Sequence, residues 1–202
     1  EANATSTEAE AFWVKRLRGL DPIEIPYRSS APATESAPEA ATIEFEAPSE
    51  FRANVSEAQG SALVSAFAAY LSRVGSRQEF DLAMEGTSLS YATKGVECFY
   101  ASSVPLHISL DSGGTAAQAM RKISKDVEAL RERGSFLLDV VARYPDLSSS
   151  NFVKAGTVAP IAVVTCSDPS TYTLMPGTDI ALVVSPDASS TCFVYDSRVL
   201  SV

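Results

Sequence analysis

The residues that most often carry chemistry are few in this chain and lie far apart. His107 is the only histidine among 202 residues, so a Ser-His-Asp triad or a zinc site would have to include it. Residues 104–110 alternate apolar and polar, which places His107 on the side of a strand opposite the apolar face. No motif sets a carboxylate beside it to orient the imidazole. We therefore expect a surface or interface histidine in preference to a general base.

The three cysteines are spread along the chain and form no Cys-x-x-Cys pair. An odd, unclustered count is typical of a reducing compartment, so we expect a cytoplasmic protein. Cys166 and Cys192 lie in apolar stretches and should be inert core residues, whereas Cys98 beside two aromatic residues fits either a buried or a reactive thiol. Because no group of residues has metal-ligand spacing either, we predict no catalytic residue and no metal site.

Two glycines precede a predicted helix, at Gly113 and Gly114, with Thr115 after them. Free backbone amides at a helix start can bind an anion, but two glycines also make a turn, and threonine caps helices. We favour the turn and cap, because neither the GxxxxGK[ST] nor the GxGxxG phosphate-binding motif occurs. The sequence therefore predicts no nucleotide site and no other cofactor.

The composition excludes two classes of partner. Sixteen Lys and Arg against twenty-five Asp and Glu give a net charge of −9, and 46% of the residues are hydrophobic, which suits a globular core. Sequence-independent binding of nucleic acid or of an anionic membrane needs clustered Lys and Arg, so we expect neither partner. No apolar run approaches the roughly 18 residues of a membrane span, and residues 1–10 lack the charged and apolar parts of a signal peptide.

One region is basic within this acidic chain, since residues 115–145 carry six basic and four acidic side chains. A solvated helix face explains this excess, and a face that docks an acidic partner explains it too. An aromatic pair near the N-terminus has the same two interpretations, as a core anchor or as a hot spot against a neighbouring domain. The candidate docking residues are Phe12, Trp13, Arg121, Lys122, Lys125, Arg131 and Arg133.

Hydrophobic spacing predicts the elements that position these residues. Apolar positions at helical spacing, with caps or glycine stops, predict helices, and alternating or continuous apolar runs predict strands. Helices are expected at 8–18, 54–75, 115–134 and 136–144, and strands at 42–46, 80–85, 104–110, 161–166, 180–185 and 192–195. Two capping boxes are expected, one formed by Asn54 with Glu57 and one by Thr115 with Gln118.

These elements predict an α/β fold, a two-layer sandwich in which helices cover a mixed β-sheet. The strand at 42–46 should lie near an edge of the sheet, and the last two strands should form a hairpin. Residues 28–50 are rich in Ala, Pro, Ser and Glu and should run as an extended, linker-like segment. We expect residues 1–202 to form one domain.

The order of motifs resembles the C-terminal lobe of condensation domains from nonribosomal peptide synthetases, relatives of chloramphenicol acetyltransferase. Residues 12–19 resemble the family's Tyr-Trp-x-x-x-Leu-x-Gly, and residues 25–28 its Leu-Pro-x-Asp-Arg-Pro. Residues 99–108 resemble Phe-Phe-Val-Asn-Thr-Leu-Pro-Leu-Arg-Val without gaps, and residues 179–201 resemble the terminal hairpin. The resemblance spans residues 9–202 and implies a chloramphenicol-acetyltransferase-like lobe.

The departures from the family pattern imply a truncated, degenerate form. Condensation domains use a His-His-x-x-x-Asp-Gly motif, and this chain has no pair of histidines. The usual Asn-Thr is Ser102-Ser103, the usual Arg is His107, and the His-Gln-Asp-x-Pro-Phe motif is reduced to residues 131–136. Ser102, Ser103 and His107 are therefore the residues that the resemblance assigns to a substrate-tunnel-like surface.

The resemblance implies three functions, of which we expect the first. A non-catalytic lobe would serve as an interdomain structural platform that packs on the adjacent adenylation domain of a synthetase. Alternatively, the chain is the C-terminal half of an active condensation domain that forms peptide bonds between carrier-bound substrates. A third alternative is a module that docks a carrier protein. In each case we expect this chain alone not to be an enzyme.

Overall fold

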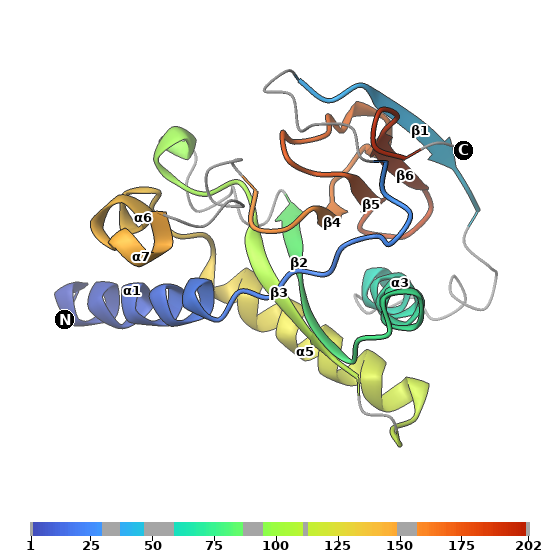
Figure 1. The fold of residues 1–202 in the computed structure, drawn as a ribbon. Helices are drawn as coiled ribbons and strands as arrows, with labels where there is room; N and C mark the ends of the chain where they lie inside the picture. Colours follow the sequence, from blue (N-terminus) through green and yellow to red (C-terminus); the bar gives the residue numbers. More distant parts are fainter. Residues whose placement is uncertain are drawn as a thin grey trace.

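The computed structural model describes residues 2–29, 37–46, 59–86, 95–110, 113–148 and 157–200. Within them a single six-stranded sheet has the strand order β1-β6-β5-β4-β2-β3 (Figure 1). The elements are α1 (Ala2–Arg18), β1 (Ala40–Glu44), α3 (Gln59–Gly75), β2 (Glu79–Gly86), η1 (Glu97–Phe99), β3 (Val104–Ser109), α5 (Ala116–Arg133), α6 (Asp139–Arg143), α7 (Pro145–Ser148), β4 (Ile161–Thr165), η2 (Pro169–Thr171), β5 (Ile180–Val184) and β6 (Thr191–Asp196).

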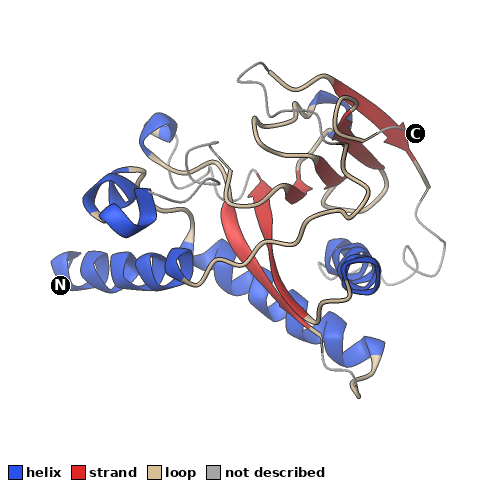
Figure 2. Ribbon diagram, in the orientation of Figure 1, coloured by secondary structure: helices blue, strands red, loops and turns tan. Residues whose placement is uncertain are grey.

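The sheet is mixed, as the sequence predicts. β2, β4 and β5 run parallel, whereas β3 pairs antiparallel with β2, and β6 pairs antiparallel with both β5 and β1. The hairpin of the last two strands is confirmed, and so is the edge position of β1. The α/β two-layer class follows from helices that cover one face of this sheet (Figure 2).

Two helices and two chain segments cover the two faces of the sheet. α3 and α5 pack against each other and against one face, where Val64 of α3, Val127 of α5 and Met84 of β2 line the same small cavity. The alternate residues of β2 point to the opposite face. That face is crossed by residues 19–29, which we call the strap, and by residues 166–179, which we call the crossing segment. Figure 1 shows the strap running from the end of α1 past β2 toward β6.

The predicted helix at 115–134 is confirmed in detail. Thr115 accepts a hydrogen bond from the backbone N–H of Gln118, and the Gln118 side chain accepts one from the backbone N–H of Thr115. The helix ends at Gly134, whose φ of 69° lies in the left-handed region that favours glycine. The other predicted capping box, Asn54 with Glu57, lies outside the described residues.

Two predictions about helix boundaries were wrong. The first helix begins at Ala2, well before the predicted residue 8. The helix predicted at 136–144 begins only at Asp139 and ends before Pro145, as predicted, and Pro145 begins a further short helix, α7. The reason is that proline is accepted at the first position of a helix, while the residue before it is pushed to extended backbone, as Tyr144 shows.

The short helices hold α1 in place. The Arg143 guanidinium contacts the Glu10 carboxylate at 2.9 Å, and Arg18 contacts Asp146 at 2.6 Å. Figure 2 shows α1, α6 and α7 grouped together, away from β1 and β6. Of the helices that the described residues form, none combines the length and the apolar character needed to cross a membrane.

Candidate functional site

The three residues assigned to a tunnel-like surface lie along β3 and its entry. Ser102 is exposed and Ser103 is 2% exposed, and both directly precede the strand. His107 is the fourth residue of β3, with 40% of its side chain exposed. At about 3.3 Å per residue, Ser103 and His107 lie roughly 13 Å apart along the strand. The structure therefore puts them on one strand but does not bring their side chains together.

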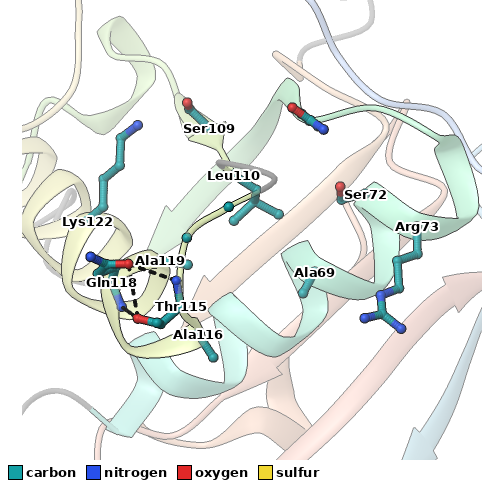
Figure 3. Close-up of a pocket in the computed structure, with 13 residues that line it drawn as sticks. Ala69, Ser72, Arg73, Ser109, Leu110, Thr115, Ala116, Gln118, Ala119 and Lys122 are labelled. Atoms are coloured by element: carbon teal, nitrogen blue, oxygen red, sulfur yellow. Dashed lines mark hydrogen bonds between the residues drawn. The ribbon is translucent and has the colours of Figure 1, made fainter.

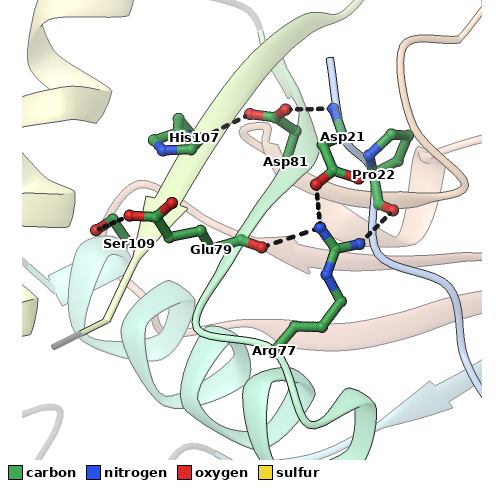
Figure 4. Close-up of polar contacts among 7 residues, drawn as sticks. All are labelled: Asp21, Pro22, Arg77, Glu79, Asp81, His107 and Ser109. Atoms are coloured by element: carbon green, nitrogen blue, oxygen red, sulfur yellow. Dashed lines mark hydrogen bonds and ion pairs between the residues drawn. The ribbon is translucent and has the colours of Figure 1, made fainter. Parts of the chain in front are cut away.

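His107 does have an orienting carboxylate, contrary to the expectation from sequence. Asp81 of β2 lies directly opposite it in the antiparallel register, and its Oδ1 is 3.1 Å from His107 Nδ1 (Figure 4). The Asp81 side chain is 4% exposed, and its Oδ2 accepts a hydrogen bond from the backbone N–H of Asp21 at 2.7 Å. No motif reveals this pair, because 26 residues separate its members and only the strand register joins them.

The polar cluster around Asp81 ties the strap to β2. The Arg77 guanidinium pairs with the Asp21 carboxylate and donates to the carbonyls of Pro22 at 3.2 Å and Glu79 at 3.1 Å (Figure 4). The backbone of Asp21 also pairs with that of Asp81. In the described part of the chain no hydroxyl or thiol hydrogen-bonds to the His107 ring. The cluster therefore holds two segments together and orients an imidazole, but it does not assemble a nucleophile with its base.

The aromatic pair near the N-terminus packs inside the molecule. The Trp13 side chain is 3% exposed and contacts the rings of Phe12 at 5.0 Å and Phe136 at 5.4 Å between centroids. Phe12 is half-buried, and the Arg133 guanidinium lies 4.1 Å from its ring centroid. Of the two interpretations of Trp13, the structure thus favours the core anchor. Of the two aromatic residues, Phe12 is the one that retains accessible surface.

The five basic candidates of α5 separate into two groups. Arg121, Lys122 and Lys125 are exposed in the first half of the helix. Arg131 lies 3.9 Å from the Glu128 carboxylate, and Arg133 covers Phe12. Only the first group is free to meet an acidic partner, because no ion pair engages it among the described residues.

A cavity of about 730 Å³ lies between α3, the end of β3 and the start of α5 (Figure 3). Its lining includes the Gly113-Gly114 turn, Thr115 and the exposed Lys122. The amide of Thr115 already donates to Gln118 Oε1 at 2.8 Å, and that of Gln118 donates to Thr115 Oγ1 at 3.3 Å. The predicted turn and cap therefore account for this helix start.

The cysteines do not form a site. Cys192 is buried, Cys166 is half-buried and Cys98 is exposed. Burial raises the pKa of the Cys166 and Cys192 thiols, which keeps both in the unreactive protonated form. In the described ranges no three His, Cys, Asp or Glu side chains are grouped so that they could hold a metal ion.

An exposed apolar surface joins two loops that are distant in sequence. We call Val96, Phe99, Leu137 and Leu138 the apolar patch, and their exposed fractions are 45%, 62%, 40% and 47%. The backbone N–H of Leu138 donates to the Phe99 carbonyl at 2.8 Å, so the two loops are fixed to each other. Large side chains at such exposure cost solvation free energy unless a partner covers them. The sequence does not predict this patch, since its halves lie about 40 residues apart and follow no shared periodicity.

No protein-family model matches this sequence, and neither does any curated protein sequence. Solved structures do match its fold. The starter condensation domain of the rhizomide synthetase RzmA is 14% identical with a TM-score of 0.68, over 98% of this chain and 48% of that chain. The X-domain in a complex with OxyB from teicoplanin biosynthesis is 14% identical with a TM-score of 0.66, over 96% and 48%.

A third structure extends this likeness to a multidomain protein. The EpoB cyclization-docking bidomain of a nonribosomal peptide synthetase from Sorangium cellulosum is 15% identical with a TM-score of 0.67, over 96% of this chain and 44% of that chain. This chain therefore spans about half of the length of the structures it matches. At these identities the likeness is one of fold, and it confirms the predicted condensation-domain-like lobe.

Proposed function

We propose that residues 1–202 act as one non-catalytic, condensation-like lobe that serves as an interdomain platform in a nonribosomal peptide synthetase. The partner would be the adjacent adenylation domain of the same synthetase. The observation that carries this proposal is the apolar patch, whose four large side chains are 40–62% exposed on two loops joined by a backbone hydrogen bond. Rigid, exposed aromatic and aliphatic side chains are typical of the anchors of protein interfaces.

Two further points support a docking role over catalysis. Within these 202 residues the single histidine is held by Asp81 in a cluster that joins the strap to the sheet. The X-domain that shares this fold occurs in a complex with another protein, OxyB. A lobe of this kind is therefore compatible with a role in binding a neighbouring domain.

The test measures binding of the whole chain to the adenylation domain encoded next to it in the same synthetase. We expect the double variant Phe99→Asp with Leu138→Asp to bind at least about tenfold more weakly by isothermal titration calorimetry, because two apolar anchors become charged. Both side chains are already exposed, so the melting temperature should change little.

Tyr70→Asp provides the matched control. Tyr70 is 60% exposed on α3 and is not part of the apolar patch. Its substitution should leave the affinity unchanged. If the wild-type chain does not bind the adenylation domain, or if the patch variant binds as tightly as the wild type, the platform proposal is wrong.

A carrier-docking module is a second candidate, favoured by the exposed cations of α5. We expect Arg121→Glu, Lys122→Glu and Lys125→Glu together to weaken binding of an acidic carrier protein at least about tenfold in low salt, and salt to weaken wild-type binding. Lys15→Glu, which changes an exposed cation on α1, is the control. Unchanged binding by the triple variant would exclude docking through this face.

The third candidate is the C-terminal half of a working condensation domain. It is favoured by the fact that this chain spans about half of the structures it matches. Two findings would support this function in place of the platform. One is a His-His-x-x-x-Asp-Gly segment upstream in the same reading frame, and the other is peptide-bond formation by that longer chain.

A further inference from the structure

A buried carboxyl group lies under the crossing segment. Glu85 of β2 pairs with Val164 of β4, and its side chain points to the face of the sheet that the strap and the crossing segment cover. Glu85 is 7% exposed. The Tyr172 hydroxyl, from the crossing segment, donates to Glu85 Oε2 at 3.0 Å, whereas Oε1 is buried without any hydrogen-bond partner.

The surroundings of Glu85 favour its neutral form. Burial raises the pKa of this carboxyl to about 7, and the hydrogen bond from Tyr172 opposes that rise only in part. Burial also raises the pKa of Tyr172, so the phenol stays protonated and is the donor. The other titratable groups nearby are Cys166, which interacts with Tyr172, and Asp81, which lies four residues before Glu85 on the same face of β2 and is already paired with His107. Among the described residues no cation contributes to the pKa of Glu85, so none compensates an ionised carboxylate there.

The crossing segment is held mainly by apolar contacts, and Tyr172 is its polar tie to β2. The side chains of Leu174 and Pro169, two residues of the segment, are buried. The Cys192 thiol lies 3.9 Å from the Pro169 carbonyl. The hydrogen bonds of Asp168 to Ser170 and Thr171 stay within the segment itself. Release of Tyr172 would therefore free the middle of the segment without breaking the sheet.

We propose that Glu85 and Tyr172 form a proton-dependent clamp, which keeps the crossing segment on the sheet while Glu85 is protonated and loosens it when Glu85 ionises. An ionised carboxylate can accept about four hydrogen bonds, and this one receives a single bond. A buried charge with unmet hydrogen bonds is costly. β2 is fixed between β3 and β4, so water reaches Glu85 most easily when the segment around Tyr172 lifts.

The direction of the effect follows from proton linkage. The pKa of Glu85 is about 7 in the folded chain and 4.5 as the ordinary value, so the clamped state holds its proton more tightly than the open one. The clamp should be firm below about pH 4.5 and should weaken as the pH rises from there through about 7.

The test is hydrogen–deuterium exchange of the whole chain, followed in peptides that cover residues 166–179 and corrected for the intrinsic pH dependence of exchange. We expect protection of these peptides to be about tenfold lower at pH 8.5 than at pH 6, because the linked equilibrium changes by up to a factor of ten for each pH unit between the pKa of the open state, 4.5, and that of the clamped state, about 7, and is constant above it. Peptides from β5 should keep equal protection at the two values.

Three variants separate the clamp from general loosening. Glu85→Gln cannot ionise and should keep the segment equally protected at both pH values. Tyr172→Phe removes the tie itself, so protection of the segment should already be lower than in the wild type at pH 6. Because the lost hydrogen bond favoured the ionised carboxylate, the remaining pH dependence should move to higher pH. Glu79→Gln, an exposed carboxyl on the same strand, should behave as the wild type. Equal protection of the wild type at pH 6 and 8.5, or a pH dependence retained in Glu85→Gln, would overturn the proposal.

Discussion

Replacing Trp13 by alanine should lower the free energy of unfolding by about 3–5 kcal/mol, the usual cost of deleting a large buried aromatic side chain. Trp13 is 3% exposed and its ring packs against Phe12 and Phe136. The deletion would leave a cavity where α1 meets the chain that follows α5. Urea denaturation followed by circular dichroism measures the loss. Tryptophan fluorescence cannot report on this variant, because Trp13 is the only tryptophan.

Phe12→Ala is the matched control, since its ring is adjacent but half-buried under Arg133. Phe12→Ala should lower the free energy of unfolding clearly less than Trp13→Ala, because folding buries less apolar surface at Phe12. The pair also distinguishes the two interpretations of the aromatic residues. If Trp13→Ala left the urea midpoint unchanged and instead abolished binding to a partner, Trp13 would be an interface residue. The interpretation of Trp13 as a core residue would then be wrong.

Local chemistry explains why much of the fold could be predicted. The alternation over 104–110 reports a strand because one face of it is buried, and β3 occupies 104–109. Thr115 and Gln118 predict a helix start because the two residues satisfy each other's backbone amides without help from the rest of the chain. The terminal hairpin is equally local, since a short turn joins β5 to β6. In each case the deciding contacts lie within a few residues.

The contacts that the sequence did not reveal are those between distant segments. Asp81 meets His107 through strand register, and Tyr172 meets Glu85 across 87 residues. Neither pair leaves a trace in composition or periodicity, because each segment contributes a single residue to it. The apolar patch is similar, since Phe99 and Leu138 become neighbours only when two loops pair. The part of the candidate site that depends on topology therefore had to come from the structure.

A second buried carboxyl makes the stability of the fold depend on pH. The Asp179 side chain is 5% exposed at the start of β5, with Arg28 Nε 3.3 Å from its Oδ2. Burial raises the pKa of Asp179 to about 6 from 3.8, the Arg28 charge opposes that rise, and Glu24 and Asp196 add to it. The folded state thus holds this proton more tightly than the unfolded chain does. Its contribution is most favourable below about pH 4 and is lost as the pH rises through about 6.

Asp179→Asn should therefore stabilise the protein at high pH relative to the wild type. A rise of about two pKa units corresponds to at most about 3 kcal/mol, and loss of the charge that faces Arg28 reduces the gain, so we expect about 1–2 kcal/mol at pH 8 and none at pH 4. Urea denaturation of both chains at pH 4, 6 and 8 measures the difference.

Asp187→Asn should change stability in the opposite sense. Hydrogen bonds from Ser185 and Ser189 lower the pKa of Asp187 to about 2, so its ionised form is the one that the fold favours. That contribution is present above about pH 4 and is lost as the pH falls toward 2, so the Asp187→Asn chain should be less stable than the wild type at pH 8.

The Asp179 prediction has a clear contrary outcome. A constant difference in the free energy of unfolding between wild type and Asp179→Asn from pH 4 to pH 8 would mean that Asp179 titrates as it does in the unfolded chain. In that case the contact with Arg28, and not the burial of the carboxyl, would govern this end of β5.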